Sequence, residues 1–353
     1  MIFMRSKEAL DKIINKSRVH LYKPIQIAEI LYQYRKGAKI DLNDLESYRN
    51  TSKKWRDGIT RRLVGRVSIS SQKFQDNLFE ANAMPPALLK ELGEYNKKND
   101  GIVEDYIYHK LKERLSMVHK ALEYIKTKGI NSFDLGTFLS LFVSEPGLKR
   151  SVDKVYEIVV YALFSTIVRA LNVEVSLEIK NKNKEILEDF SGFINLVLRL
   201  SKGRTSVSVP ARLFRVGVTN AADRGLDMWT NFGPAIQVKH ISLSEELAED
   251  VTDSISADNI ILVCKDGEQE LIKKIITQLP SGQKIQGIIT FGDLRRWYGQ
   301  CLSAKYKEAL GKQLLADLER EFDNEFPVST ELGPFLKERG YNELKLKGDW
   351  SLA

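Results

Sequence analysis

Residues 221–240 read AADRGLDMWTNFGPAIQVKH and are the most informative part of the chain. We expect a strand, a tight turn at Phe232-Gly233-Pro234 and a second strand, because glycine tolerates positive φ and proline cannot enter a central ladder. Side chains alternate along a strand, so Gln237 and Lys239 face the same side. Pairing of the two strands then brings Asp227, near the start of the first strand, to the same end of a sheet.

An acid, an amide and an amine at one end of a sheet are suited to metal-assisted attack on a phosphodiester. Asp227 can hold a divalent cation, and Lys239 can stabilise the charge of the transition state or polarise a water. The spacing resembles the nuclease motif PD-(D/E)XK, with Gln237 where a second acid is usual. The alternative is a solvated sheet face, on which Lys239 forms only a surface ion pair with Asp227.

Longer blocks of sequence resemble the HaeII-type restriction endonucleases, over most of the chain before fading after about Trp297. These blocks are residues 16–32, 74–80, 145–151, 156–164, 220–229, 237–240 and 254–258. The resemblance implies a type II restriction endonuclease that uses Mg²⁺ to cut double-stranded DNA at a short palindrome with a GCGC core, RGCGCY. A symmetric site implies a symmetric protein, so a homodimer is expected. A cognate DNA methyltransferase is expected in the same cell.

The neutral Gln237 leaves the expected metal site short of one carboxylate, and Glu157 is our candidate to supply it. Glu157 lies at the edge of the apolar face of a helix predicted over residues 151–171, before the core sheet, where related nucleases often place an accessory acid. The alternative is an ordinary flank position paired with Lys154, since a free charge in apolar surroundings is costly. The next candidates are Asp153 and Asp223, followed more weakly by Glu245 and Glu246.

The excess positive charge lies in the N-terminal fifth of the chain. Residues 1–80 contain 17 Lys and Arg against 9 Asp and Glu, whereas the net charge of the whole chain is +7. A basic lobe suits a polyanionic partner such as DNA, although a solubilising surface has the same composition. Lys and Arg can neutralise phosphates, and Asn or Arg can read base edges. The densest basic run contains Arg49, Asn50, Lys53, Lys54, Trp55, Arg56, Arg61, Arg62 and Arg66. Two further candidates for DNA contact, Asn220 and Arg224, closely precede Asp227 in the sequence.

The predicted elements change in kind near residues 145–147. We expect an α/β (α+β) fold of the restriction-endonuclease type, with a mixed central sheet flanked by helices and a helical N-terminal region. The predicted regions are 1–145, helical, basic and DNA-binding; 146–300, the nuclease core; and 301–353, a C-terminal helical extension. Beside the strand pair at 226–240, the pattern predicts strands at 173–179, 206–218, 260–264 and 285–290. It predicts helices that begin at Pro24 and at Pro85-Pro86, and helices at 41–49, 53–64, 104–126, 151–171, 184–200, 244–255, 271–279 and 302–322. The helix at 184–200 is expected to be an insertion into the nuclease core, and Ser244 is the expected N-cap of the helix at 244–255.

Other functional classes have little support. The chain has no apolar run long enough for a membrane span and no signal-peptide core, so we expect a cytoplasmic protein. Its two cysteines, Cys264 and Cys301, indicate a reducing compartment without a disulfide framework or zinc site. The histidines are scattered along the sequence, which argues against a His-metal-finger nuclease. The sequence also has no glycine-rich phosphate-binding loop of the kind that ATP-driven translocation on DNA requires. A catalytically decayed DNA-binding protein and a repair or modification-dependent nuclease remain alternatives.

Overall fold

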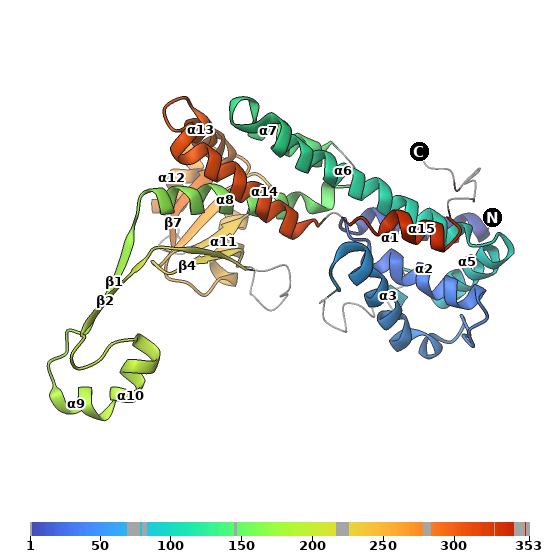
Figure 1. The fold of residues 1–353 in the computed structure, drawn as a ribbon, viewed down its shortest axis with the longest axis horizontal. Coiled ribbons are helices and arrows are strands. Elements are labelled where there is room, and N and C mark those ends of the chain that lie inside the picture. Colours follow the sequence, from blue (N-terminus) through green and yellow to red (C-terminus); the bar gives the residue numbers. More distant parts are fainter. Residues whose placement is uncertain are drawn as a thin grey trace. The chain divides into compact units, whose positions relative to one another are not determined.

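A computed structural model gives the fold of the protein (Figure 1). It describes residues 2–68, 78–79, 83–144, 147–216, 226–277, 284–327, 329–341 and 350. These residues form two compact units. The helical unit contains the described residues up to Ile158 and from Leu318 onward, and the sheet unit contains the described residues from Val159 to Asp317. This division concerns compactness, so the three functional regions expected above remain a prediction.

The helical unit is built almost entirely from helices, as its sequence predicted. Its elements are α1 (Ile2–Lys16), α2 (Tyr22–Arg35), η1 (Leu45–Ser47), α3 (Arg49–Val64), α5 (Pro86–Lys98), α6 (Ile102–Ser132), α7 (Leu135–Val143), η2 (Lys149–Ser151), the first turns of α8 (Val152–Ala170), the end of α14 (Lys312–Glu325) and α15 (Leu332–Glu338). No helix in the described part of the chain is both long and apolar enough to cross a membrane.

Buried charges link both ends of the chain within the helical unit. Glu29 of α2 accepts hydrogen bonds from Tyr108 Oη at 2.5 Å and from Arg339 Nη2 at 3.1 Å. Glu104 of α6 forms a bidentate pair with Arg35, with N–O distances of 2.9 and 2.8 Å. Burial raises the pKa of the Glu29 carboxyl group, an effect that the neighbouring Arg339 opposes.

The sheet unit contains a five-stranded mixed sheet in the order β3-β4-β5-β6-β7. Its strands are β3 (Leu213–Arg215), β4 (Met228–Thr230), β5 (Ala235–Val238), β6 (Ile260–Cys264) and β7 (Ile285–Thr290). The first three strands are antiparallel, and β5, β6 and β7 are parallel. The expected mixed sheet flanked by helices is therefore confirmed.

Two helices, α11 (Glu245–Ser254) and α12 (Gln269–Thr277), contribute to the core of the sheet unit. Apolar side chains of α11 and Ile275 of α12 form one buried cluster with Ala235 of β5, Ile260 of β6 and other strand residues. Leu247 N donates to Ser244 Oγ at 3.1 Å, which confirms the predicted N-cap of α11. The cluster fixes β5, the strand that contains Gln237, against its neighbours.

The predicted strand, turn and strand at residues 226–240 are confirmed as β4 and β5. Gly233 adopts a φ of 123° in the connection, a conformation that favours glycine. Thr230 Oγ1 donates to Pro234 O at 2.9 Å and closes the turn.

Three helix predictions need correction. Residues 41–49 form only the short η1 before α3, because Asp41 and Asp44 accept local backbone hydrogen bonds that compete with a helix. Residues 184–200 are divided into α9 (Lys184–Asp189), α10 (Ser191–Phe193) and a π-helical turn, η3 (Ile194–Leu198). The helix predicted at 302–322 corresponds to α14, but α14 begins only at Lys312, after the π-helical turn η5 (Lys307–Gly311). Leu302 is instead the last residue of α13 (Phe291–Leu302), a helix that was not predicted.

The strands predicted at 173–179 and 206–218 also differ from expectation. β1 (Glu174–Glu178) and β2 (Ser206–Pro210) pair with each other in a separate antiparallel ribbon, and only β3 joins the main sheet. The insertion into the nuclease core is therefore longer than the helix first assigned to it. We call residues 173–210 the arm; its ribbon leads to α9 and α10 (Figure 1).

Candidate active site

The register of β4 and β5 places Asp227 beside Gln237. Met228 pairs with Ile236 and Trp229 with Ala235, so one further step along the antiparallel ladder brings Asp227 opposite Gln237. Val238 N donates to Asp227 Oδ2 at 2.8 Å. This hydrogen bond holds the carboxylate against β5.

Gln237 is a buried polar residue whose amide oxygen lacks a hydrogen bond. Its exposed fraction is 3%, and Oε1 has no partner among the described residues. An unpaired buried polar group destabilises a fold by about 1–3 kcal/mol. Such a group, next to a carboxylate, is consistent with an oxygen donor retained for a ligand.

Lys239 follows Gln237 by two positions, so its Cβ lies on the same face of β5. Its backbone N donates to Val263 O of β6 at 2.8 Å, and its side chain is half-buried. Asp227, Gln237 and Lys239 therefore come together at one end of the sheet, as the sequence predicted. The described residues contain no group of three or more His, Cys, Asp or Glu side chains suited to a metal ion.

Glu157 is buried in α8 and paired with a lysine. Both of its carboxylate oxygens accept from Lys154 Nζ at 2.7 Å. This is the arrangement named above as the alternative to metal binding. Asp153, one turn earlier, is exposed, whereas Asn220, Asp223 and Arg224 lie outside the described residues.

Helix α3 contains most of the basic run and presents a face suited to a polyanion. Between residues 49 and 65, all of which are described, no exposed residue is acidic or apolar. The exposed residues are Asn50, Thr51, Lys54, Gly58, Arg61, Arg62 and Gly65. A Cβ at Gly58 would meet no atom within 4 Å, so packing does not require glycine inside this helix. Its open surface lets a ligand approach the helix backbone, a feature that our sequence analysis missed.

Several basic residues of α3 have partners within the helical unit. Arg56 is buried; its Nη2 donates to Asp57 Oδ1 at 2.7 Å and its Nη1 to Gln26 Oε1 at 3.2 Å. Arg49 pairs with Glu46 at 2.9 Å, and Arg62 pairs with Glu338 at 2.7 Å. Lys53, Trp55 and Arg66 are half-buried. The helix therefore exposes fewer candidate residues for DNA contact than the basic run in the sequence contains.

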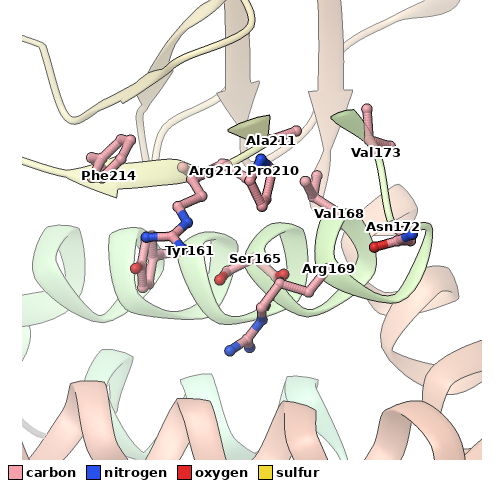
Figure 2. A pocket seen from close by; sticks show the side chains of 11 residues that line it. Tyr161, Ser165, Val168, Arg169, Asn172, Val173, Pro210, Ala211, Arg212 and Phe214 are labelled. Atoms are coloured by element: carbon pink, nitrogen blue, oxygen red, sulfur yellow. Dashed lines mark hydrogen bonds between the residues drawn. The ribbon is translucent and has the colours of Figure 1, made fainter. Parts of the chain in front are cut away.

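An open pocket of about 540 Å³ lies in the sheet unit between α8 and residues 210–214 (Figure 2). Its lining includes Arg169 and Arg212, and Arg212 extends toward Tyr161 (Figure 2). Arg169 is engaged with the buried Asp317 of α14. None of Asp227, Gln237 and Lys239 lines this pocket, so it is distinct from the candidate active site.

Comparison with known proteins adds a family relationship to this geometry. The model of the HaeII restriction endonuclease family matches residues 6–341, so the similarity continues beyond Trp297, where we expected it to fade. Type II restriction enzyme HaeII of Haemophilus aegyptius is 52% identical over 340 residues, 96% of this chain and 97% of that protein. Type II restriction enzyme NgoBI of Neisseria gonorrhoeae is 51% identical over 341 residues, with the same shares covered. No solved structure matches the chain.

Proposed function

Because the chain belongs to the HaeII restriction endonuclease family, we propose that it cuts double-stranded DNA at a palindrome with a GCGC core, RGCGCY. Its relatives are type II restriction enzymes, and the chain is accordingly a site-specific endodeoxyribonuclease. The recognition sequence rests on the resemblance of its sequence blocks. The catalytic residues of the proposal are Asp227, Gln237, Lys239 and Glu157.

The observation that supports this site most strongly is the unpaired oxygen of Gln237 beside the Asp227 carboxylate. Mg²⁺ prefers oxygen ligands and is commonly held by one or two carboxylates together with waters and substrate phosphates. Asp227 and Gln237 fit that donor set, and they would hold the ion. When bound, Mg²⁺ neutralises phosphate charge and lowers the pKa of a water.

The protein side chains have separate tasks in this proposal. The hydrogen bond from Val238 N fixes the Asp227 carboxylate before substrate arrives. Gln237 supplies a dipole without adding charge, and the ammonium group of Lys239 stabilises the negative charge that grows on the phosphate oxygens. The lysine acts on the transition state, so its loss lowers the rate more than the affinity.

We propose Glu157 as the additional carboxylate that a site with a neutral Gln237 requires. Its pairing with Lys154 holds the charge in buried surroundings and has to rearrange for Glu157 to bind a metal ion. Glu157→Gln is expected to raise the Mg²⁺ concentration needed for cleavage. Gln237→Glu is expected to restore part of that loss in the double variant, because groups that bind one cation show coupled effects. Independent effects of the two changes would instead direct attention to Asp153 or Asp223.

Contacts with DNA are proposed for the exposed face of α3, through Asn50, Lys54 and Arg61. Arg49 and Lys53 stand at the edge of this face, and the buried Arg56 orients the helix through Asp57 and Gln26. Asn220 and Arg224 are retained as proposed contacts near the scissile bond because they precede Asp227 closely in the sequence.

A two-fold symmetric DNA site also leads us to propose a homodimer with one active site for each strand. The same reasoning proposes a cytoplasmic protein that acts beside a cognate DNA methyltransferase without a stable complex between them.

A plasmid digest with Mg²⁺ tests this function. We expect a fixed set of fragments whose ends map to RGCGCY, and no cleavage by Asp227→Asn, which retains an oxygen to accept from Val238 N. DNA binding by the variant is expected to persist. Binding without cleavage by the natural protein would favour the decayed nuclease, and cuts confined to damaged or modified DNA would favour the repair alternative.

A further inference from the structure

The arm is almost fully exposed, although it contains two strands and two helices. Within residues 173–210, all of which are described, only Ile194 and Leu200 are buried. In both β1 and β2, four of the five residues are exposed. An isolated two-stranded ribbon is marginally stable in water, because it has no covered face. The arm therefore has the surface of an element that is completed by a partner.

The far part of the arm exposes large apolar side chains. Phe190 is 59% exposed, Phe193 56% and Leu196 85%. Ile186 and Val197, on the same segment, are also exposed. Single exposed apolar residues are normal, but five of them between residues 186 and 197, at the end of an extension, are typical of a protein–protein interface. Aromatic residues are enriched in the centres of such interfaces.

The charges of the arm favour a protein partner, and specifically the arm of a second copy of this chain. The arm has six Lys and Arg and five Asp and Glu, so its formal net charge is only +1, which is a small positive charge for a DNA-binding surface. Lys180, Lys182 and Lys184 come before the acidic residues Glu185 and Asp189, and Glu188 between these two acids is paired with Lys202 within the arm. When two such segments pack in opposite directions, the basic part of each faces the acidic part of the other.

We infer that the arm is the surface through which two copies of this chain associate, with Phe190, Phe193 and Leu196 at its centre. A stable interface uses about 20–30 residues from each partner, which the arm can provide. This inference rests on the proposed function, because a nuclease that cuts both strands of a palindrome needs two active sites. It adds the location of the contact to the proposed homodimer.

The test is to replace the three apolar side chains and to measure mass in solution without DNA. The full-length variant Phe190→Ser/Phe193→Ser/Leu196→Ser is compared with the natural protein by sedimentation equilibrium. We expect a dimer for the natural protein, and a dissociation constant for the variant weakened by roughly 100-fold or more, since buried aromatic residues dominate interface energies. Val143→Ser, at a 56% exposed position of α7 outside the arm, is the matched control and is expected to remain dimeric.

Folding and function are measured separately from association. Because the three replaced residues are exposed in the single chain, the circular dichroism spectrum of the variant at low concentration should equal that of the natural monomer. A triple variant that dimerises as tightly as the natural protein overturns the inference, and so does a natural protein that stays monomeric at every concentration. A natural protein that dimerises through the arm but does not cut DNA leaves this inference standing and refutes the proposed function.

Discussion

Gln237 affects stability and activity in opposite directions. Its buried, unpaired oxygen destabilises the fold, whereas methionine has a similar length and no strong polar group. Gln237→Met is therefore expected to raise the free energy of unfolding by about 1–3 kcal/mol and to abolish cleavage. Urea unfolding and plasmid cleavage measure the two effects.

A matched control for this change is available in the helical unit. Gln26 is equally buried, but its amide is satisfied: Nε2 donates to Ser52 Oγ at 2.9 Å and Oε1 accepts from Arg56. Gln26→Met should therefore destabilise the protein. Equal loss of stability at both positions would show that the Gln237 oxygen has a partner in solution, and full cleavage by Gln237→Met would remove it from the active site.

His20 makes stability depend on pH. Burial, followed by the charges of Arg66 and Arg18, lowers the pKa of the imidazole from 6.5 to about 4. The unfolded chain therefore takes up a proton at a higher pH than the folded chain, so stability falls as pH decreases from about 6.5 to about 4. Over this pH range, His20 is expected to lower the free energy of unfolding by about 3 kcal/mol. The variant His20→Phe, which keeps a ring next to Phe326, should lack this pH-dependent loss.

The measurement compares the urea unfolding of both proteins between pH 7 and pH 4. Carboxylates elsewhere titrate in both, so the difference between the two curves isolates His20. A constant difference over this range would mean that the imidazole titrates normally in the folded state.

The sequence predicts a residue's position well where that position depends only on nearby residues. Strand alternation and a single turn place Asp227, Gln237 and Lys239, and both of these features can be recognised from a short stretch of sequence. Arg56 was expected to contact DNA but is buried, because the inner side of α3 contains polar residues such as Ser52 and Thr60. Trp55, Ile59 and Leu63 stand at helical spacing, but the neighbouring row of Ser52, Arg56 and Thr60 is polar, so the sequence does not indicate that this row is buried as well.

Helix α3 gives a prediction about the salt dependence of DNA binding. Lys54→Gln together with Arg61→Gln should weaken binding to all sequences and reduce the log–log salt slope by roughly 0.9 for each phosphate that the variant no longer neutralises. The matched control is Lys90→Gln with Lys98→Gln, at exposed positions of α5 that remove the same charge. Filter binding over a range of salt concentrations gives the slope.

Equal reductions by both pairs would show that only net charge matters, and α3 would then not bind the DNA directly. Loss of discrimination at one base pair, with an unchanged slope, would identify these side chains as readers of bases.

Elements with local determinants were predicted more accurately than those with distant partners. Helix α11 follows from its Ser244 cap, and β6 from a short apolar run. Strands β1 and β2 were recognised, but alternation does not say which strand pairs with which, and the two strands pair with each other. Helix α13 was missed although Thr290 and Asp293 form a capping box, a motif that is visible in the sequence.

The ion pair between Glu29 and Arg339 connects parts of the chain that are 310 residues apart. Both side chains are buried or nearly so, and the guanidinium group also lies over the Tyr32 ring. Arg339→Met leaves the buried Glu29 without its ionic partner, although the hydrogen bond from Tyr108 remains, and is expected to reduce the free energy of unfolding by about 3–5 kcal/mol.

The double variant Glu29→Gln/Arg339→Met should recover part of this stability, as measured by thermal unfolding, because the uncompensated charge is gone. Additive losses would show that the two residues stabilise the unit independently.

Association through the arm would make the timing of cleavage depend on protein accumulation. At subunit concentrations far below the dissociation constant, the amount of dimer grows with the square of the subunit concentration. A modifying enzyme that works as a single subunit instead gains activity in direct proportion to its amount. If the cognate methyltransferase proposed above acts in this way, its activity rises earlier than that of the nuclease, and the dissociation constant of the arm interface sets the length of that delay.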